Sequence, residues 1–511
     1  MRNTRPFQTE RSWILPDLFA RAAVRIEDDE SIPEISITSL TDDSRAVAPG
    51  ACFVAIRGAG RDGHEFIPAA LKGGAAAIVV EYKAQKPCNA AVVRVHDTRE
   101  ALSKLAAAFY GLRGAADPPL RLIGVTGTNG KTTVTWLLRS ILQAACEPTA
   151  LLGTVEYDLL AERRAAPLTT PGSLELCRCL AMARDAGATY SVLEVSSHAL
   201  DQRRCDGLKF TAGVYTNLSG DHLDYHRTMD DYFAAKCRLF ERLEPPAVAV
   251  LNAEDARTGA LKDRCAVPVV TFGIDDARAD VVGRIQSLDR RGTRFSIRGR
   301  SLEMSIQTSL IGRHNVSNAL AATATAEAVG IPSSAIQDGL QRASGAPGRL
   351  QRVESTSWPF SVFVDYAHTD DALRNVLTAL RPLTGRRLLC VFGCGGDRDR
   401  RKRPRMAAVV GELADAAYVT SDNPRTEDPH AIIDEILPGF SRSSACRVEV
   451  NADRRRAIEA ALSAAGPGDT VLIAGKGHET YQLVGDRVLH FDDVEVARRW
   501  LETASITEAV A

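Results

Sequence analysis

Glycine, lysine and threonine residues at 127–133 form a candidate phosphate-binding loop. The run Gly127-Thr-Asn-Gly-Lys-Thr-Thr133 follows an apolar segment and opens a helical one. Glycines in such a loop let backbone N–H groups converge on phosphate oxygens, and the helix N-terminus favours negative charge. Lys131 can reach the β- and γ-phosphates, and the Thr132 hydroxyl can bind Mg²⁺. Val125 stands where the general pattern has its first glycine. We predict a nucleoside triphosphate site, which leaves kinases, ATPases and ligases open.

Glu194 is the best candidate for a Mg²⁺ ligand. It interrupts the apolar run Ser191–Val195, where a carboxylate is costly unless it is paired or bound to a metal. The alternative is a salt-bridged strand end. His222 and His226 are four residues apart, but no His-Glu-x-x-His pattern supports zinc, and a hydrogen-bonded loop histidine stays open for His226. Lys236, on a probable helix, is by residue type alone a surface lysine.

The tetrapeptide Asp422-Asn-Pro-Arg425 is a candidate site for a charged amino acid. It follows a predicted strand, and Pro424 fixes a backbone turn. Arg425 offers a planar fork suited to a carboxylate, and Asp422 can balance an ammonium group. The alternative is a plain loop turn. The basic run Arg398-Asp-Arg-Arg-Lys-Arg403 is typical of a solvated surface.

These motifs need elements to position them. Short runs rich in Val, Ile and Leu alternate with helical stretches, which predicts parallel sheets covered on both faces. Ligands of open α/β sheets bind beyond the carboxyl ends of the strands, where the polar motifs stand. The predicted strands are Leu122–Val125, Ser191–Val195, Ala212–Tyr215, Ala247–Leu251, Val269–Phe272, Ser361–Val364, Leu388–Phe392, Ala417–Thr420 and Thr470–Ile473.

Two passages rich in Gly, Pro and Ala divide the chain into three segments. The two passages are Gly111–Pro119 and Ser344–Gly348. The three segments are 1–117, 118–347 and 348–511, and each has the size of a domain. We therefore predict an α/β protein of three domains, with a mixed α/β first domain and parallel sheets in the other two.

Composition narrows the class of protein. The chain has 511 residues, of which 45% are hydrophobic and 25% charged, as in ordinary globular proteins. Lys and Arg total 63 and Asp and Glu total 64, so a net charge of −1 gives no basic excess for nucleic acid or an anionic membrane. No window approaches the ~18 apolar residues of a membrane span, and no signal peptide is evident. The 11 cysteines form no CxxC pair, so we expect reduced thiols and a cytoplasmic protein.

Several motifs together resemble the Mur ligase family. They are Gly127-Thr-Asn-Gly-Lys-Thr132, Glu194-Val-Ser-Ser-His198, His222-Leu-Asp-Tyr-His226, His314-Asn-Val-Ser-Asn318 and Asp365-Tyr-Ala-His368, in this order. The resemblance runs from Asp43-Ser-Arg45 to Gly475-Lys-Gly-His-Glu479, which is nearly the whole chain. Mur ligases are ATP-dependent enzymes that form amide bonds in peptidoglycan precursor synthesis. The resemblance implies a first domain that holds the UDP part of the substrate, a central P-loop domain that binds ATP, and a Rossmann-like last domain that presents an amino acid.

The resemblance also implies roles for individual residues. Lys131, Glu194, His222 and Lys236 are the implied catalytic residues, and Lys236 is the implied site of a carbamate (N6-carboxylysine), which turns a cation into an oxygen-donating anion. The implied Mg²⁺ ligands are Thr132, Glu194, His222 and the carbamate on Lys236. The implied ATP contacts are Gly127, Thr128, Asn129, Gly130, Lys131, Thr132, Thr133, Asn315, Asn318, Arg349, Asp365 and His368.

Within the family, the chain resembles the members that attach meso-diaminopimelate to UDP-N-acetylmuramoyl-L-alanyl-D-glutamate. The implied contacts with that nucleotide-linked dipeptide are Ser44, Thr169, Thr170, Ser196, Gln202 and Arg204. The implied contacts with diaminopimelate are Arg398, Asp422, Asn423, Pro424, Arg425, Gly475 and Glu479. L-Lysine lacks the distal carboxylate of diaminopimelate, so a buried arginine without that partner would penalise it. We expect a monomer with no nucleic-acid partner and no membrane insertion.

Other functions stay open at this point. A ligase that adds L-lysine or a folylpolyglutamate synthetase would share the ATP site, although Asp422-Asn-Pro-Arg425 disfavours both. A P-loop kinase or motor ATPase would transfer or hydrolyse phosphate without forming an amide. A nucleotide-binding scaffold without activity would be expected to lose Lys131, Glu194 or His222, and all three are present.

Overall fold

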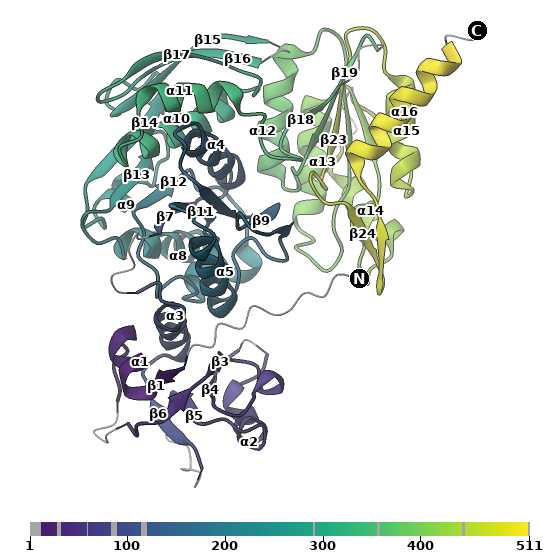
Figure 1. Cartoon of the computed structure of the whole chain (residues 1–511). Helices are drawn as coiled ribbons and strands as arrows, with labels where there is room; N and C mark the ends of the chain where they lie inside the picture. Colours follow the sequence, from purple (N-terminus) through teal and green to yellow (C-terminus); the bar gives the residue numbers. More distant parts are fainter. Residues whose placement is uncertain are drawn as a thin grey trace.

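The computed structural model describes residues 12–27, 32–58, 60–82, 89–113, 120–289, 292–354, 358–441 and 445–508. Figure 1 shows three bodies along the chain, so the predicted three-domain α/β architecture is confirmed. Residues 114–119 of the first predicted junction lie outside the described part, as do residues 1–11 and Cys88. Across the described residues, every helix is too short or too polar to cross a bilayer.

The first domain is built on a small parallel sheet. Its strand order is β3-β4-β5-β6, and a two-stranded antiparallel sheet, β1-β2, lies beside it. The elements are β1 (Trp13–Ile14), α1 (Leu15–Ala22), β2 (Ser36–Ile37), β3 (Ser39–Thr41), β4 (Ala51–Val54), α2 (Ile67–Lys72), β5 (Ala77–Val80), β6 (Ala91–Arg94) and α3 (Thr98–Phe109). Helix α3 meets the central domain, where Glu100 pairs with Arg203 at 2.8 Å.

The central domain has an 11-stranded sheet of order β10-β9-β8-β11-β7-β12-β13-β14-β15-β16-β17. Strands β8, β11, β7, β12, β13, β14 and β15 run parallel, and antiparallel strands extend the sheet at both edges. The strands are β7 (Arg121–Thr126), β8 (Thr149–Leu152), β9 (Glu156–Asp158), β10 (Arg163–Ala165), β11 (Tyr190–Glu194), β12 (Ala212–Tyr215), β13 (Val248–Asn252), β14 (Val269–Ile274), β15 (Val281–Asp289), β16 (Gly292–Arg298) and β17 (Glu303–Thr308).

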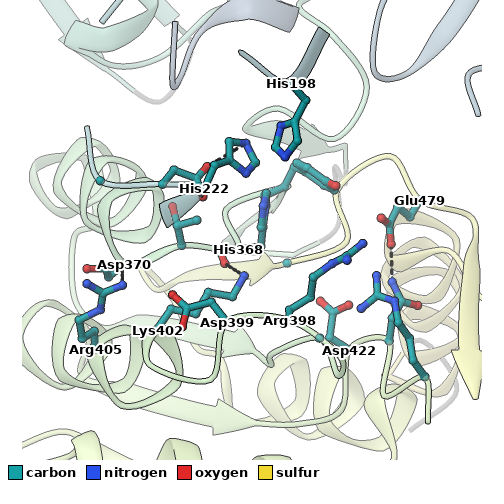
Figure 2. Close-up of a pocket in the computed structure, with 18 residues that line it drawn as sticks. His198, His222, His368, Asp370, Arg398, Asp399, Lys402, Arg405, Asp422 and Glu479 are labelled. Carbon is teal, nitrogen blue, oxygen red and sulfur yellow. Dashed lines mark hydrogen bonds and ion pairs between the residues drawn. The ribbon is translucent and has the colours of Figure 1, made fainter. Parts of the chain in front are cut away.

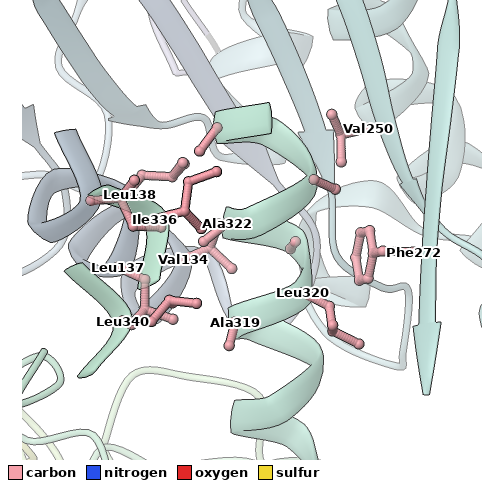
Figure 3. Close-up of a cluster of buried hydrophobic side chains, with 14 of the residues drawn as sticks. Val134, Leu137, Leu138, Val250, Phe272, Ala319, Leu320, Ala322, Ile336 and Leu340 are labelled. Carbon is pink, nitrogen blue, oxygen red and sulfur yellow. The ribbon is translucent and has the colours of Figure 1, made fainter. Parts of the chain in front are cut away.

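Helices cover both faces of this sheet. They are α4 (Lys131–Ala144), α5 (Ser173–Asp185), α6 (Ser197–Asp201), α7 (Leu223–His226), α8 (Met229–Glu241), α9 (Thr258–Lys262), α10 (Arg313–Ala328) and α11 (Ser333–Arg342). Figure 3 shows Leu137 of α4 and Ile336 of α11 on one side of α10, and Leu320 of α10 beside Phe272 of β14 on the other side; all four belong to one buried cluster. Each fully buried Leu or Ile side chain contributes about 1.5–3 kcal/mol, so this cluster fixes helix α4, which carries the phosphate loop.

The last domain is a second, mostly parallel sheet of order β18-β19-β23-β20-β21-β22. Its strands are β18 (Gln351–Val353), β19 (Ser361–Asp365), β20 (Leu388–Phe392), β21 (Ala416–Val419), β22 (Arg447–Val450) and β23 (Thr470–Ala474). The helices are α12 (Asp370–Leu380), α13 (Lys402–Leu413), α14 (Pro429–Ile436), α15 (Arg454–Ala464) and α16 (Asp493–Glu508). A hairpin of β24 (Tyr481–Val484) and β25 (Arg487–His490) follows the sheet.

Every predicted strand coincides with an observed one to within one or two residues at each end. The antiparallel edge strands β9, β10, β16 and β17 were not among the predictions, because their alternating polar residues do not form apolar runs.

Candidate active site

The phosphate loop lies between β7 and α4, at the carboxyl edge of the central sheet. Gly127 and Gly130 have φ of 144° and 89°, and a Cβ atom at Gly127 would lie 1.9 Å from the Thr216 hydroxyl oxygen. Glycine is therefore required there on both conformational and steric grounds. Lys131 folds back over the loop, and its Nζ donates to the carbonyl oxygens of Gly127 and Thr128, each at 2.9 Å. Burial lowers the pKa of Lys131.

Glu194 ends strand β11 beneath this loop and is 1% exposed. Its Oε2 accepts hydrogen bonds from the hydroxyls of Thr132 at 3.0 Å and Thr154 at 2.9 Å, and its Oε1 accepts one from the Thr154 backbone N–H at 2.8 Å. Among the described residues, this buried carboxylate is thus satisfied by hydrogen bonds rather than by a salt bridge.

A cavity of about 190 Å³, here called the phosphate-loop cavity, joins these groups. Besides Lys131, Thr132 and Glu194 it is lined by Thr169, Ser196, His222 and Lys236. The chain therefore brings all four predicted catalytic residues to one cavity, although they come from separate elements. Thr154 and Asp221, which the sequence did not single out, also line it.

His222 precedes helix α7 with a left-handed φ of 54°, and Nε2 lies 3.6 Å from the Asp221 carboxylate. Burial lowers the pKa of His222, which favours the neutral imidazole that binds metals. His226 instead turns inward, and a ring nitrogen lies 2.9 Å from the Ser197 hydroxyl. His226 is thus a buried, hydrogen-bonded histidine, the alternative that the sequence left open.

Lys236 corrects the expectation drawn from its residue type. It is 1% exposed rather than a surface lysine, and its Nζ lies 4.2 Å from the centroid of the Tyr232 ring. Helix α8 places it there because Thr228 caps the helix, and Tyr232 and Lys236 share the inward face. Burial and the nearby Lys131 hold the pKa of Lys236 well below its usual range. Both effects disfavour the protonated form of the amine.

The donor set suits Mg²⁺ only together with a ligand. Carboxylate and hydroxyl oxygens are hard donors, and Mg²⁺ is commonly held by one or two carboxylates plus substrate phosphates. Thr132 and Glu194 supply such oxygens at 3.0 Å from each other. Within the described residues, no set of three His, Cys, Asp or Glu side chains is gathered as a metal site. Phosphates and a modified Lys236 would therefore have to complete the coordination.

A second cavity of about 340 Å³, here called the α10 cavity, adjoins the first. Asn315 and Asn318 line it from α10, and Arg349 and Asp365 line it from the last domain. Arg349 donates to the Thr132 hydroxyl at 3.1 Å, so it reaches across to the phosphate loop. His368 lies outside the α10 cavity and lines the phosphate-loop cavity instead. Asn217, Ser219, Phe272, His314 and Asp371 line the α10 cavity without having been predicted.

A third cavity of about 370 Å³ lies between the central and last domains and is here called the interdomain cavity (Figure 2). His198 and His222 enter it from one side, and Arg398, Asp422 and Glu479 from the other. The predicted residues that line it are Arg398, Asp422, Asn423, Arg425, Gly475 and Glu479; Pro424 does not. Cations and carboxylates thus alternate around one space, which suits a ligand that carries both charges.

Arg425 is held in a left-handed conformation, with φ of 53°. Its backbone N–H donates to the Leu483 carbonyl at 3.0 Å, and its guanidinium donates to the Gly396 carbonyl at 2.7 Å. Asn423 donates to Glu479 Oε2 at 2.7 Å. The tetrapeptide is therefore a constrained loop, fastened on one side by strand β24.

The basic run at 398–403 is not uniformly solvated. Arg403 is 0% exposed and pairs with Glu427 and Glu435, both at 2.8 Å, so the expectation of a solvated face is wrong for this residue. Arg398 and Lys402 line the interdomain cavity, and Lys402 Nζ donates to the His368 carbonyl at 2.9 Å.

Most of the residues predicted to contact the nucleotide-linked dipeptide lie close together in the central domain, and Ser44 lies apart from them. Thr170 accepts from the Ser196 N–H at 3.0 Å, and Arg204 donates to the Thr170 carbonyl at 2.7 Å and to Gln202 at 2.8 Å. Ser44 lies in the first domain, at the start of a short 3₁₀ helix, and lines none of the three cavities described above.

Three family models match the chain in order. They are the Mur ligase family catalytic domain at residues 36–110, the Mur ligase middle domain at 125–326 and the Mur ligase glutamate ligase domain at 348–477. These ranges fall within the predicted segments, whose exact boundaries stay predictions.

Relatives match over nearly full length. The UDP-N-acetylmuramoyl-L-alanyl-D-glutamate–2,6-diaminopimelate ligase of Gloeobacter violaceus is 45% identical over 95% of this chain and 98% of its own. A solved structure of a ligase with the same name is 34% identical, with a TM-score of 0.69 over 97% of this chain and 99% of that one. The fold is also shared by a MurF ligase from Thermotoga maritima solved in complex with ADP, at 18% identity and a TM-score of 0.61 over 92% and 98%.

Proposed function

The chain belongs to the Mur ligase family, and on that premise we propose that it joins meso-diaminopimelate to UDP-N-acetylmuramoyl-L-alanyl-D-glutamate with ATP. As a member of this family it is an ATP-dependent ligase that forms an amide bond in peptidoglycan synthesis, and its relatives are named UDP-N-acetylmuramoyl-L-alanyl-D-glutamate–2,6-diaminopimelate ligases. The observation that supports these substrates is that the three cavities lie next to one another.

The three cavities share walls. Arg349 lines both the α10 cavity and the phosphate-loop cavity, while His222 and His368 line both the phosphate-loop cavity and the interdomain cavity. Ligation through an acyl phosphate needs a phosphate, a carboxylate and an amine to meet at one point, and holding them together supplies much of the rate enhancement. We assign the nucleotide to the α10 cavity, the dipeptide carboxylate to the phosphate-loop cavity and diaminopimelate to the interdomain cavity.

The proposed chemistry has two steps. The γ-carboxylate of D-glutamate attacks the γ-phosphorus of ATP, which gives an acyl phosphate and releases ADP. The free amine at the L-centre of diaminopimelate then attacks the acyl carbon, and the tetrahedral intermediate loses phosphate and a proton to give the amide. Lys131, freed from its two carbonyl partners by a bound nucleotide, is placed to stabilise the charge that develops on the phosphate.

Thr132, Glu194, His222 and a carbamate on Lys236 would hold Mg²⁺, which when bound neutralises phosphate charge. The carbamate is supported by the burial of Lys236 and by its lowered pKa, because an unprotonated amine can attack CO₂. Its oxygens would turn a buried cation site into an anionic one. A cytoplasmic location and a monomeric state stay predictions.

The test is phosphate release from ATP with the nucleotide-linked dipeptide, comparing meso-diaminopimelate with L-lysine. We expect release to require both the dipeptide and diaminopimelate, and Lys131→Ala to abolish it. Preference for L-lysine would keep the ligase activity but overturn the assignment of the amino acid. Release that needs neither substrate would overturn the ligase assignment in favour of an ATPase.

A further inference from the structure

Lys476 is a buried cation directly behind the proposed amino-acid site. It follows strand β23 in the run Gly475-Lys-Gly-His-Glu479, and it is 0% exposed. Its side chain does not line the interdomain cavity, so none of the assignments above uses it. A buried ammonium group is costly unless partners compensate the lost hydration, and its partners therefore show what it is for.

The partners of Lys476 are the two residues that face the cavity beside it. Its Nζ donates to Glu479 Oε2 at 3.1 Å and to Asn423 Oδ1 at 3.2 Å. Asn423 Nδ2 in turn donates to the same Glu479 oxygen at 2.7 Å. The three side chains thus form a closed triangle in which each contacts the other two.

This triangle fixes the orientation of both cavity-facing groups. Asn423 Oδ1 receives a second hydrogen bond, from the Leu483 N–H at 3.0 Å, so two donors determine which way the amide points. Both hydrogen bonds to the Glu479 carboxylate arrive at Oε2. Among the described residues, no donor contacts Oε1, which leaves that oxygen for an ammonium group of the ligand.

We propose that Lys476 is a positioning residue that holds Glu479 and Asn423 in the orientation in which they bind the amino acid. This inference rests on the proposed function, because it takes the interdomain cavity to be the diaminopimelate site. Lys476 acts through Glu479 and does not touch the substrate. It also balances the Glu479 charge, so that the site is matched to a ligand that carries both ammonium and carboxylate groups.

Steady-state phosphate release by Lys476→Met, with each substrate varied in turn, tests the proposal. We expect the KM for diaminopimelate to rise roughly tenfold or more, because the substitution removes one partner of a buried charge pair. The KM for ATP should stay within about twofold, because the α10 cavity, assigned to the nucleotide, shares no lining residue with the interdomain cavity. In the Glu479→Gln background, Lys476→Met should add less than about threefold, because the two residues act as one unit.

Arg387→Met is the matched control. Arg387 pairs at 2.7 Å with the buried Asp469, which precedes the opposite end of the same strand β23. Its loss should leave the KM for diaminopimelate unchanged. If Lys476→Met does not fold, Lys476→Gln serves for the same comparison, since it keeps a hydrogen-bond donor without the charge.

Three outcomes would overturn the positioning role: an unchanged KM for diaminopimelate, an equal rise in the KM of all substrates, or full additivity with Glu479→Gln. Failure of the proposed function would look different, because the wild-type protein itself would then show no release that depends on diaminopimelate. If the wild type used L-lysine, the same comparison with L-lysine would decide the role of Lys476.

Discussion

At the scale of single residues, burial decides the chemistry. Glu194 and Lys236 are each 1% exposed and line the same small cavity, yet within the described part of the chain only Glu194 has hydrogen-bond partners for its charged group. Lys236 faces an aromatic ring and a second lysine, Lys131, which disfavours its protonated form. Burial and the neighbouring lysine therefore both disfavour a proton on Lys236, which supports the proposed carbamate.

Replacement of this lysine tests the carbamate. Lys236→Ala should lower turnover by about 100-fold or more, because it removes the negatively charged carbamate proposed for the reaction centre. Formate or acetate should restore part of the activity by supplying the missing oxygens, as measured by phosphate release against added carboxylate. Lys262→Ala, on the exposed end of α9, should behave as wild type. A folded Lys236→Ala protein that no carboxylate rescues would contradict the carbamate.

At the scale of elements, two neighbours hold the strand–loop–helix unit β7–α4 in place: the hydrophobic core around α4 and the segment that follows β12. The core in Figure 3 holds α4, and Thr216, which follows β12, donates to the Asn129 carbonyl at 2.6 Å. The loop thus has no room for a side chain at its first glycine. Its shape is set by neighbouring elements as much as by its own residues.

Gly127→Ala tests this constraint. The added Cβ would overlap the Thr216 hydroxyl and would strain a positive φ, so we expect turnover with ATP to fall by about 100-fold or more. Gly187→Ala is the control, since Gly187 also has a positive φ, of 92°, but open space around it. It should cost about 1 kcal/mol of stability and leave turnover intact. Equal turnover in the two variants would contradict the steric argument.

At the scale of the whole molecule, histidines at the domain contacts make stability depend on pH. Burial lowers the pKa of His314, His368 and His478 to about 4, from 6.5 in the unfolded chain. Between these values the unfolded chain binds more protons than the native one, so the free energy of unfolding falls as the pH falls through this window. Their contribution is fully present above about pH 6.5.

Urea unfolding measured at several values between about pH 7 and pH 5 checks this dependence. We expect the protein to lose stability on acidification, and His314→Gln to lose less than wild type. His490 is a control of opposite sign, because its hydrogen bond to Glu495 raises its pKa. An unchanged pH slope in His314→Gln would show that this histidine titrates normally in the folded protein.

Much of this architecture follows from local patterns. Nine parallel strands of the central and last domains were predictable because they are continuous apolar runs, and the motifs that follow β7, β11 and β21 were predictable because ligands gather at carboxyl edges. The parallel strands β8, β15 and β22 and the sheet of the first domain were not among the predictions. The burial of single charged residues could not be predicted from such patterns. Lys236 and Arg403 lie on helices whose other charged residues are exposed or half-buried. Only tertiary neighbours, such as Lys131 beside Lys236 and Glu427 beside Arg403, distinguish them. Lys476 and its partner Glu479 were visible as parts of one motif, but its other partner, Asn423, comes from another loop.

The shared walls between the three cavities also matter for the design of inhibitors. A compound that fills the interdomain cavity alone must compete with an amino acid for a polar and open space. One that extends past His222 and His368 into the phosphate-loop cavity would occupy two subsites while losing its translational and rotational freedom only once. A linked molecule should therefore bind more tightly than its halves suggest, and the histidines between the two subsites determine the length of its linker.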